Sequence, residues 1–101
     1  MSYIDELRET IHKVHGATAT HVESVPVIET LNGQTIWDGI VEVFDIHGHP
    51  GTHRVYAWSQ ETDDSDDPKR YVTVLHLPPV VSPIRAVRAA IVQEYRANAK
   101  A

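Results

Sequence analysis

The chain of 101 residues is long enough for one hydrophobic core, and we expect a single domain over residues 1–101. Its composition, with 42% hydrophobic and 23% charged residues, is typical of a globular protein, and no apolar run approaches membrane-spanning length, so we expect a cytoplasmic protein without a leader peptide. The absence of cysteine excludes disulfides and thiol nucleophiles, and the net charge of -5 disfavours sequence-independent binding of nucleic acids.

The N-terminal segment has the pattern of an amphipathic helix that begins at Tyr3. Ser2 can accept a hydrogen bond from the first turn, and Asp5 favours the positive end of the helix dipole. Gly16 can adopt the left-handed conformation that ends a helix. One face must pack against the core, because apolar residues recur on it at helical spacing: Ile4, Leu7, Ile11 and Val14.

Four β-strands are predicted to follow this helix. Pro26 removes one ladder donor from the first strand and indicates an edge strand or a bulge. Asn32 and Gly33 tolerate the positive φ of a tight hairpin turn, and residues 48–51 have turn chemistry throughout. The predicted strands cover residues 17–31, 34–47, 52–60 and 71–77.

Residues 61–68 concentrate aspartates and predict a mobile, solvated loop between the third and fourth strands. Ser82 as a cap and Pro83 at the first helical position predict a second helix that reaches about Ala97. The order α-β-β-β-β-α indicates an α+β fold with an antiparallel four-stranded meander. Two helices can cover only one face of a sheet about 19 Å wide, so we expect both terminal helices on one face.

The second face of such a sheet would be open and apolar. Both alternating sets of residues 34–47 contain large apolar side chains. Exposed apolar surface of this extent is unusual in a monomer. We therefore expect a homodimer through the open sheet face; the alternative is that loop 61–69 or the C-terminal tail covers it. The candidate interface residues are Ile40, Phe44, Tyr56 and Trp58.

Potential metal ligands cluster around the turn between the second and third strands, in the pattern Asp-x-His-x-His-x-x-x-His. On an extended strand the first three would share a face, and the last could approach from the returning strand. Three imidazoles and a carboxylate suit zinc or nickel. Because Gly48 and Pro50 interrupt the strand, plain solvation at the hairpin tip is the alternative. The four residues are Asp45, His47, His49 and His53.

The C-terminal helix carries Arg85, Arg88 and Arg96 near one stripe, with Val92 between them. This strip would suit an anion, although arginines on the solvated face of an amphipathic helix have the same spacing. The element order and the basic start of this helix resemble the double-stranded-RNA-binding domain, which implies RNA binding through the arginines. The extra strand, the acidic net charge and the absent basic loop depart from that pattern, so nucleic acid is not the expected partner.

Other catalytic or ion-binding patterns are weak. The aspartates at 63, 64, 66 and 67 lack the central glycine and closing glutamate of a calcium-binding EF-hand loop, so calcium is not expected. No nucleophile elbow or glycine-rich phosphate loop is readable. His21 and His76 lie in predicted strands and would serve as general bases if they lined a cleft. The sequence leaves open whether the protein is an enzyme.

Four strings resemble a family of short bacterial proteins of unknown function: His-Val-Glu-Ser-Val-Pro-Val at 21–27, Thr-Ile-Trp-Asp-Gly-Ile-Val-Glu-Val-Phe at 35–44, Gly-His-Pro at 48–50 and Tyr-Ala-Trp at 56–58. The resemblance implies a bacterial cytosolic protein and no particular activity. The patterns together favour a small homodimeric binding or scaffold module. The alternatives are a divalent-metal protein or metal-assisted enzyme at the aspartate–histidine pattern, and an RNA-binding protein that uses the helix arginines.

Overall fold

A computed structural model of the chain describes residues 2–62, 65–66 and 69–99. The predicted α+β class and the antiparallel meander are confirmed, with the strands in the order β1-β2-β3-β4. Most of the aspartates of the predicted mobile loop, at 63, 64 and 67, lie outside the described residues. The elements are α1 (Tyr3–His15), β1 (Thr18–Leu31), β2 (Gln34–His47), β3 (Arg54–Glu61), β4 (Lys69–Leu75) and α2 (Pro83–Ala99).

The local signals for the first helix and the first hairpin act as predicted. The Ser2 hydroxyl accepts a hydrogen bond of 3.2 Å from the amide of Asp5. Gly16 ends α1 in the left-handed conformation with φ of 67°. Asn32 and Gly33, with φ of 53° and 79°, form the turn between β1 and β2.

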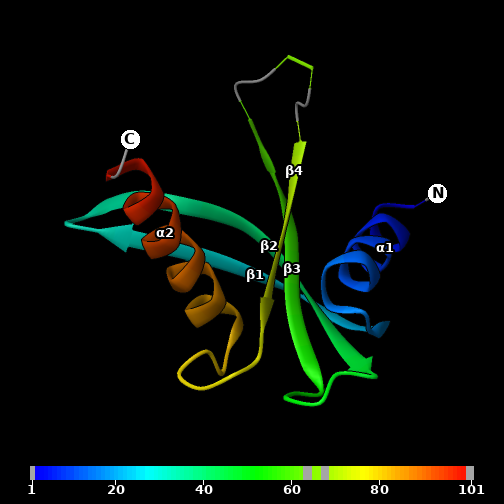
Figure 1. The fold of residues 1–101 in the computed structure, drawn as a ribbon. Helices are drawn as coiled ribbons and strands as arrows, with labels where there is room; N and C mark the ends of the chain where they lie inside the picture. Colours follow the sequence, from blue (N-terminus) through cyan, green and yellow to red (C-terminus); the bar gives the residue numbers. More distant parts are fainter. Residues whose placement is uncertain (1, 63–64, 67–68, 100–101) are drawn as a thin grey trace.

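The two hairpins of the sheet cross each other (Figure 1). β1 pairs with β2 along almost its whole length, with register shifts at 21–23 and 29–30. β2 pairs with β3 only from Glu42–Ala57 to Asp45–Arg54, a seam of four residue pairs, before the strands diverge. β3 and β4 then pair without a register shift. The sheet is therefore strongly twisted, and the seam lies at its centre.

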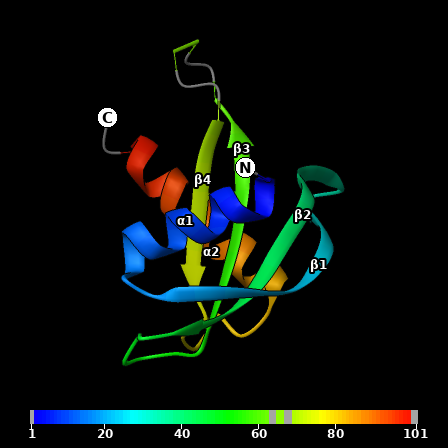
Figure 2. The same ribbon diagram turned by 90° about the vertical axis from the view of Figure 1, so that its right-hand side faces the viewer.

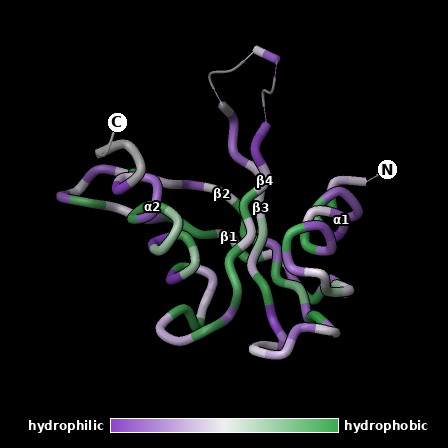
Figure 3. Tube along the Cα trace, in the orientation of Figure 1, coloured by the Kyte–Doolittle hydropathy of each residue, from purple (hydrophilic) through white to green (hydrophobic). Residues whose placement is uncertain are grey.

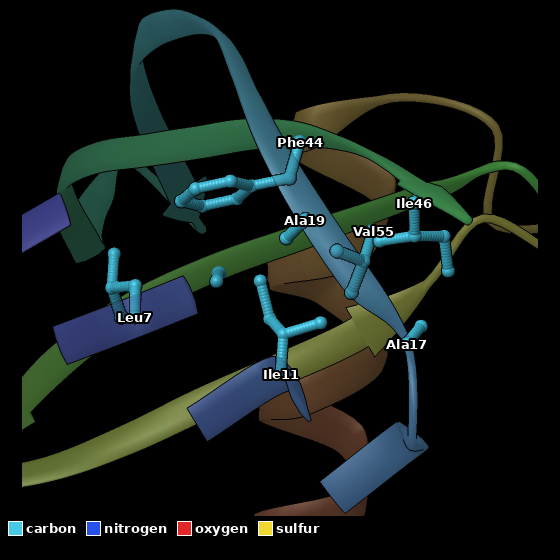
Figure 4. Close-up of a cluster of buried hydrophobic side chains, with 8 residues drawn as sticks. Leu7, Ile11, Ala17, Ala19, Phe44, Ile46 and Val55 are labelled. Carbon is cyan, nitrogen blue, oxygen red and sulfur yellow. The ribbon is translucent and has the colours of Figure 1, made fainter. Parts of the chain in front are cut away.

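The two helices cover opposite faces of the sheet, so the prediction that both lie on one face is wrong (Figures 1 and 2). Leu7 and Ile11 of α1 pack against one set of strand residues, which includes Phe44 and Val55 (Figure 4). On the other face, residues of α2 pack with the alternate set: Val27, Val41, Val43, Tyr56 and Trp58, around Ala86 and Val87.

The physical reason for the correction is the crossing of the hairpins. A flat sheet of four strands would need two helices side by side on one face, but the crossed hairpins present a narrow central area on each face. One helix is enough to cover that area. Figure 3 shows hydrophobic residues along the strands between the helices and hydrophilic residues at the outer ends of β3 and β4.

This arrangement removes the open apolar face that the sequence suggested. Phe44, Tyr56 and Trp58 are exposed by only 0%, 2% and 1%, so three of the four predicted interface residues are core residues in this fold. The face opposite α1 is covered by α2. The alternative, a cover formed by loop 61–69 or by the C-terminal tail, falls partly outside the described residues. Ile40 remains accessible, with 48% of its surface exposed.

Candidate functional site

A groove of about 590 Å³ runs between the outer side of α2 and the segment that leads into this helix. Its size falls in the range of small-ligand pockets, which is about 300–1,000 Å³. The groove combines apolar surface with three guanidinium groups from one face of α2. The lining residues are Pro79, Val80, Arg85, Arg88, Ala89, Val92, Gln93 and Arg96.

The helical repeat explains why these side chains share one groove. Arg85, Arg88, Val92 and Arg96 follow the three- and four-residue spacing of one helix face, as the sequence predicted. The opposite face of α2 is anchored in the core through Ala86 and Val87, both fully buried. The arginine face therefore points away from the core.

The three arginines differ in how they are held. Arg85 donates a hydrogen bond of 3.2 Å from Nη1 to the carbonyl of Pro79, so it is held against the opposite wall of the groove. Arg88 forms an ion pair with Glu29 of β1, and this hydrogen bond lowers the pKa of the Glu29 carboxyl below its usual value. The Arg96 side chain makes no hydrogen bond or ion pair within the described part of the chain.

Along α2, apolar Val92 lies between Arg88 and Arg96, so the groove offers apolar and cationic surface side by side. Val92 is 47% exposed, so an apolar ligand group could cover it and remove its surface from water. Arg96 could then pair with a ligand anion without losing an existing partner. The arrangement suits an anionic molecule with an apolar body, and the described groove contains no acid or histidine that would serve as a general acid or base.

The predicted metal ligands are spread around the tip of the second hairpin. Asp45 is paired with Arg54, whose Nη2 lies 3.2 Å from its carboxylate. His49 turns back on its own loop, where its Nδ1 accepts a hydrogen bond of 3.0 Å from the amide of Gly51. His47 and His53 are exposed. Asp45 and His53 do line a common hollow of about 440 Å³, together with His76.

Within the residues that the structure describes, no group of three or more histidine or acidic side chains is arranged to hold a metal ion. The sequence pattern required the strand to stay extended through residue 49, but Gly48 takes a φ of 95° and redirects the chain. The zinc or nickel site at Asp45, His47, His49 and His53 therefore stays a prediction without geometric support.

One polar cluster was not found from the sequence. Glu42 is only 5% exposed, and its carboxylate shares a hydrogen bond of 2.9 Å with Nε2 of His21 and accepts another from the Ser24 hydroxyl. The acid in the middle of an otherwise apolar run was the available signal. Because the carboxylate, and not the histidine, contacts the serine, the cluster lacks the order of a nucleophilic triad. It satisfies a buried charge beside the bulge at 21–23.

The second predicted base, His76, is also engaged. Its Nδ1 lies 2.6 Å from the hydroxyl of Tyr56, and burial raises the pKa of that hydroxyl above its usual value. This pair ties the end of β4 to β3. His76 lines the hollow beside Asp45 and His53, but its ring is already oriented by a core tyrosine.

A second surface feature lies on the β1–β2 hairpin, on the face away from α2. Ile36 and Ile40 alternate along β2, and Ile28 of β1 pairs opposite Asp38 between them, so the three isoleucines point the same way. Their exposed fractions are 44%, 48% and 60%. We call Ile28, Ile36 and Ile40 the isoleucine patch. Most of the apolar surface predicted from the sequence is buried under the helices, and this patch is a part that stays exposed.

Comparison with known proteins gives no relative. No protein-family model matches the chain, and neither the curated proteins nor the solved structures contain a significant match. The resemblance to short bacterial proteins therefore gains no support from these comparisons. None of the described helices has the length and apolar character needed to cross a membrane.

Proposed function

We propose that this protein is a small cytoplasmic binding module that holds an anionic ligand with an apolar body in the α2 groove. The observation that carries the proposal is the meeting of three arginines with apolar surface in one hollow of about 590 Å³. The groove lies on a chain of net charge -5, so its local charge is opposite to that of the whole molecule.

Binding in this groove would follow from two separate contributions. The apolar body would cover Val92, Ala89 and Val80, and each buried methylene contributes about 0.8 kcal/mol. The anionic group would pair with Arg96 and reach toward Arg88. A charged hydrogen bond of this kind contributes about 1.5–3 kcal/mol when it is well shielded from water.

The test is a titration with octanoate, followed by amide chemical shifts and by calorimetry. We expect shift changes to gather on residues 79–80 and on the outer face of α2. Octanol, which has a similar chain without the charge, should bind at least about tenfold more weakly. Equal binding of octanoate and octanol, or shift changes centred on another surface, would contradict the proposal.

Substitutions test which arginine binds the carboxylate of octanoate. Arg96→Gln should weaken octanoate binding by about tenfold without affecting folding, because Arg96 has no partner in the described structure. Arg70→Gln on β4 is the matched control, since it removes the same charge outside the groove. Similar losses in both variants would point to a general charge effect, not to a groove site.

RNA binding through the same arginines stays a competing prediction. It would produce a steep fall in affinity as salt rises, because phosphate contacts release counterions. A duplex RNA titration at several salt concentrations distinguishes the two ligands. Strong, salt-sensitive RNA binding lost in Arg96→Gln would replace the small-ligand proposal.

The isoleucine patch favours homodimer formation as a second candidate property of the module. A contiguous apolar patch on a sheet face is a common site of self-association, and Ile40 was already a predicted interface residue. The proposed occupant is the same patch of a second copy related by a two-fold axis. Asp38 lies on the same face between Ile36 and Ile40, so the isoleucines surround one charged side chain in each copy.

Light scattering on chelator-treated protein tests this second candidate. The wild-type chain should behave as a dimer at micromolar concentration, and Ile40→Glu should be a monomer. Val92→Glu, which changes an equally exposed residue on α2, is the control and should stay dimeric. A monomeric wild-type protein, or the same mass for all three proteins, would exclude the isoleucine patch as an interface.

A further inference from the structure

The free edge of β4 has backbone groups that lack a partner among the residues that the structure describes. The amide of His76 donates a hydrogen bond of 3.0 Å to the carbonyl of Arg54, which fixes the alternation of the β3–β4 ladder. Residues 70, 72, 74 and 76 therefore direct their backbone groups toward β3. Tyr71, Thr73 and Leu75 direct their amides and carbonyls outward.

Only one of these outward groups is satisfied within the described residues. The carbonyl of Leu75 accepts a hydrogen bond of 2.9 Å from the amide of Leu77. The amides of Tyr71, Thr73 and Leu75 and the carbonyls of Tyr71 and Thr73 have no protein partner in the part of the chain that the structure describes. Five polar groups in a regular row form the pattern that another strand requires.

The edge lies at the bottom of a groove of about 460 Å³ between the two helices. Val14 of α1 forms one wall, and Ala90, Gln93 and Glu94 of α2 contribute to the other. Figure 1 views this edge from the front, with α1 and α2 on its two sides, and Figure 2 shows the C-terminal turns of α1 extending past β4.

We propose that the β4 edge binds an extended segment of a partner polypeptide, which adds to the sheet as a fifth strand. The backbone of such a segment would pair with Tyr71 and Thr73, and its side chains would alternate between the two walls. Those directed at α1 meet Val14, which is 61% exposed, so apolar residues fit there. Those directed at α2 meet Gln93 and Glu94, with Arg70 of β4 on the same side, so polar residues that pair with both an acid and a base fit there.

The walls favour a single segment over a second copy of this chain. Antiparallel pairing of two β4 strands would place two sheets edge to edge, and each sheet carries a helix on both faces. Because α1 extends beyond β4, the α1 helices of the two copies would meet in the same space beside Thr73. An isolated extended segment brings no helices with it and fits between the walls.

The experiment uses a phage-displayed library of random peptides selected on the folded full chain, with the enriched peptides then synthesised. The first readout is hydrogen exchange of the wild-type protein. The amides of Tyr71 and Thr73 should exchange at least about tenfold more slowly when peptide is bound, since each gains a hydrogen bond. Unchanged exchange at both amides would overturn the proposal, as would a library that yields no binder.

Two substitutions at one position supply the second readout. Thr73→Pro removes an outward amide and no β3–β4 ladder bond, so the fold should persist while peptide affinity falls at least about tenfold. Thr73→Val retains the outward amide and should bind as the wild type does. If Thr73→Pro binds normally, or if light scattering shows dimers that Thr73→Pro abolishes, a single added segment is the wrong occupant.

Discussion

The two edges of the sheet are treated in opposite ways. On β1, the outward position at 26 is a proline, which has no amide to offer to another strand. The outward carbonyl of Ala19 accepts a hydrogen bond of 2.9 Å from Nε of Arg8, and a bulge at 21–23 interrupts the edge between these points. On β4, the residues between Lys69 and Leu75 include no proline and no register shift.

The difference shows which edge must be protected and which can remain available. β1 has 14 residues and lies at the outside of a long hairpin, where an unprotected edge invites aggregation. β4 has 7 residues and lies between two helices that limit access to it. The proline, the hydrogen bond from Arg8 and the bulge each block pairing along the long edge of β1. The short edge of β4 keeps its hydrogen-bonding groups available.

The largest expected effect comes from a proline at a β4 position whose backbone amide points toward β3. Val74→Pro removes an amide that points toward Tyr56 of β3 and leaves a buried carbonyl unpaired, which should cost about 2–3 kcal/mol of unfolding free energy. Thr73→Pro, one residue away, should cost clearly less. Urea unfolding of the two variants checks this, and equal losses would show that the outward and inward positions are assigned wrongly.

Removing the hydrogen bond from Arg8 to the Ala19 carbonyl of β1 should have the next largest effect. Arg8→Ala leaves the Ala19 carbonyl without its charged donor, and we expect a loss of about 1–2 kcal/mol because the hydrogen bond is partly buried. Lys13→Ala, on the same helix with a solvent-exposed ion pair to Glu9, should change stability by less than about 0.5 kcal/mol. Thermal or urea unfolding distinguishes the two.

Opening the β1 edge should change association more than stability. Pro26→Thr restores an outward amide and gives the unfolded chain more freedom, so we expect a loss of about 0.4–1 kcal/mol. The clearer sign should be concentration-dependent growth in particle mass by light scattering. A Pro26→Thr protein that keeps the wild-type mass at high concentration would show that the proline does not guard the edge.

The smallest expected effect is a pH dependence at the α1 wall beside β4. Burial, and secondarily the charge of His49, lower the pKa of His15 below its usual value near 6.5. Unfolded chains therefore bind a proton at His15 more readily than the native state does, and native stability falls as pH drops from about 6.5 through the folded pKa. His15→Gln should flatten the stability profile in this window; an unchanged slope would assign it to other histidines.

Local chemistry made most of the fold predictable, whereas the arrangement in space was harder to predict. Ser2, Gly16 and the Asn32–Gly33 turn each act through their nearest neighbours, so their effects can be read from spacing alone. Alternation likewise showed that both faces of the sheet are apolar. It does not say which helix covers which face, because that depends on the short seam between β2 and β3.

Only one wall of the candidate groove could be predicted from the sequence. Helical spacing placed Arg85, Arg88 and Arg96 on one stripe, but the opposite wall, Pro79 and Val80, comes from a connecting segment with no periodic pattern. The prediction of a metal site assumed a regular strand where the chain has none. It extended strand geometry across Gly48, where the backbone leaves the strand. Spacing arguments hold within a regular element and end at its last residue.

The four-pair seam between β2 and β3 has a mechanical consequence. So short a junction offers little resistance to rotation of one hairpin about the other. Each helix, however, contacts both hairpins from its own side of the sheet, α1 through the cluster with Phe44 and α2 through the cluster with Trp58. The helices therefore act as two opposed clamps, and the angle between the hairpins is set by helix packing more than by strand pairing.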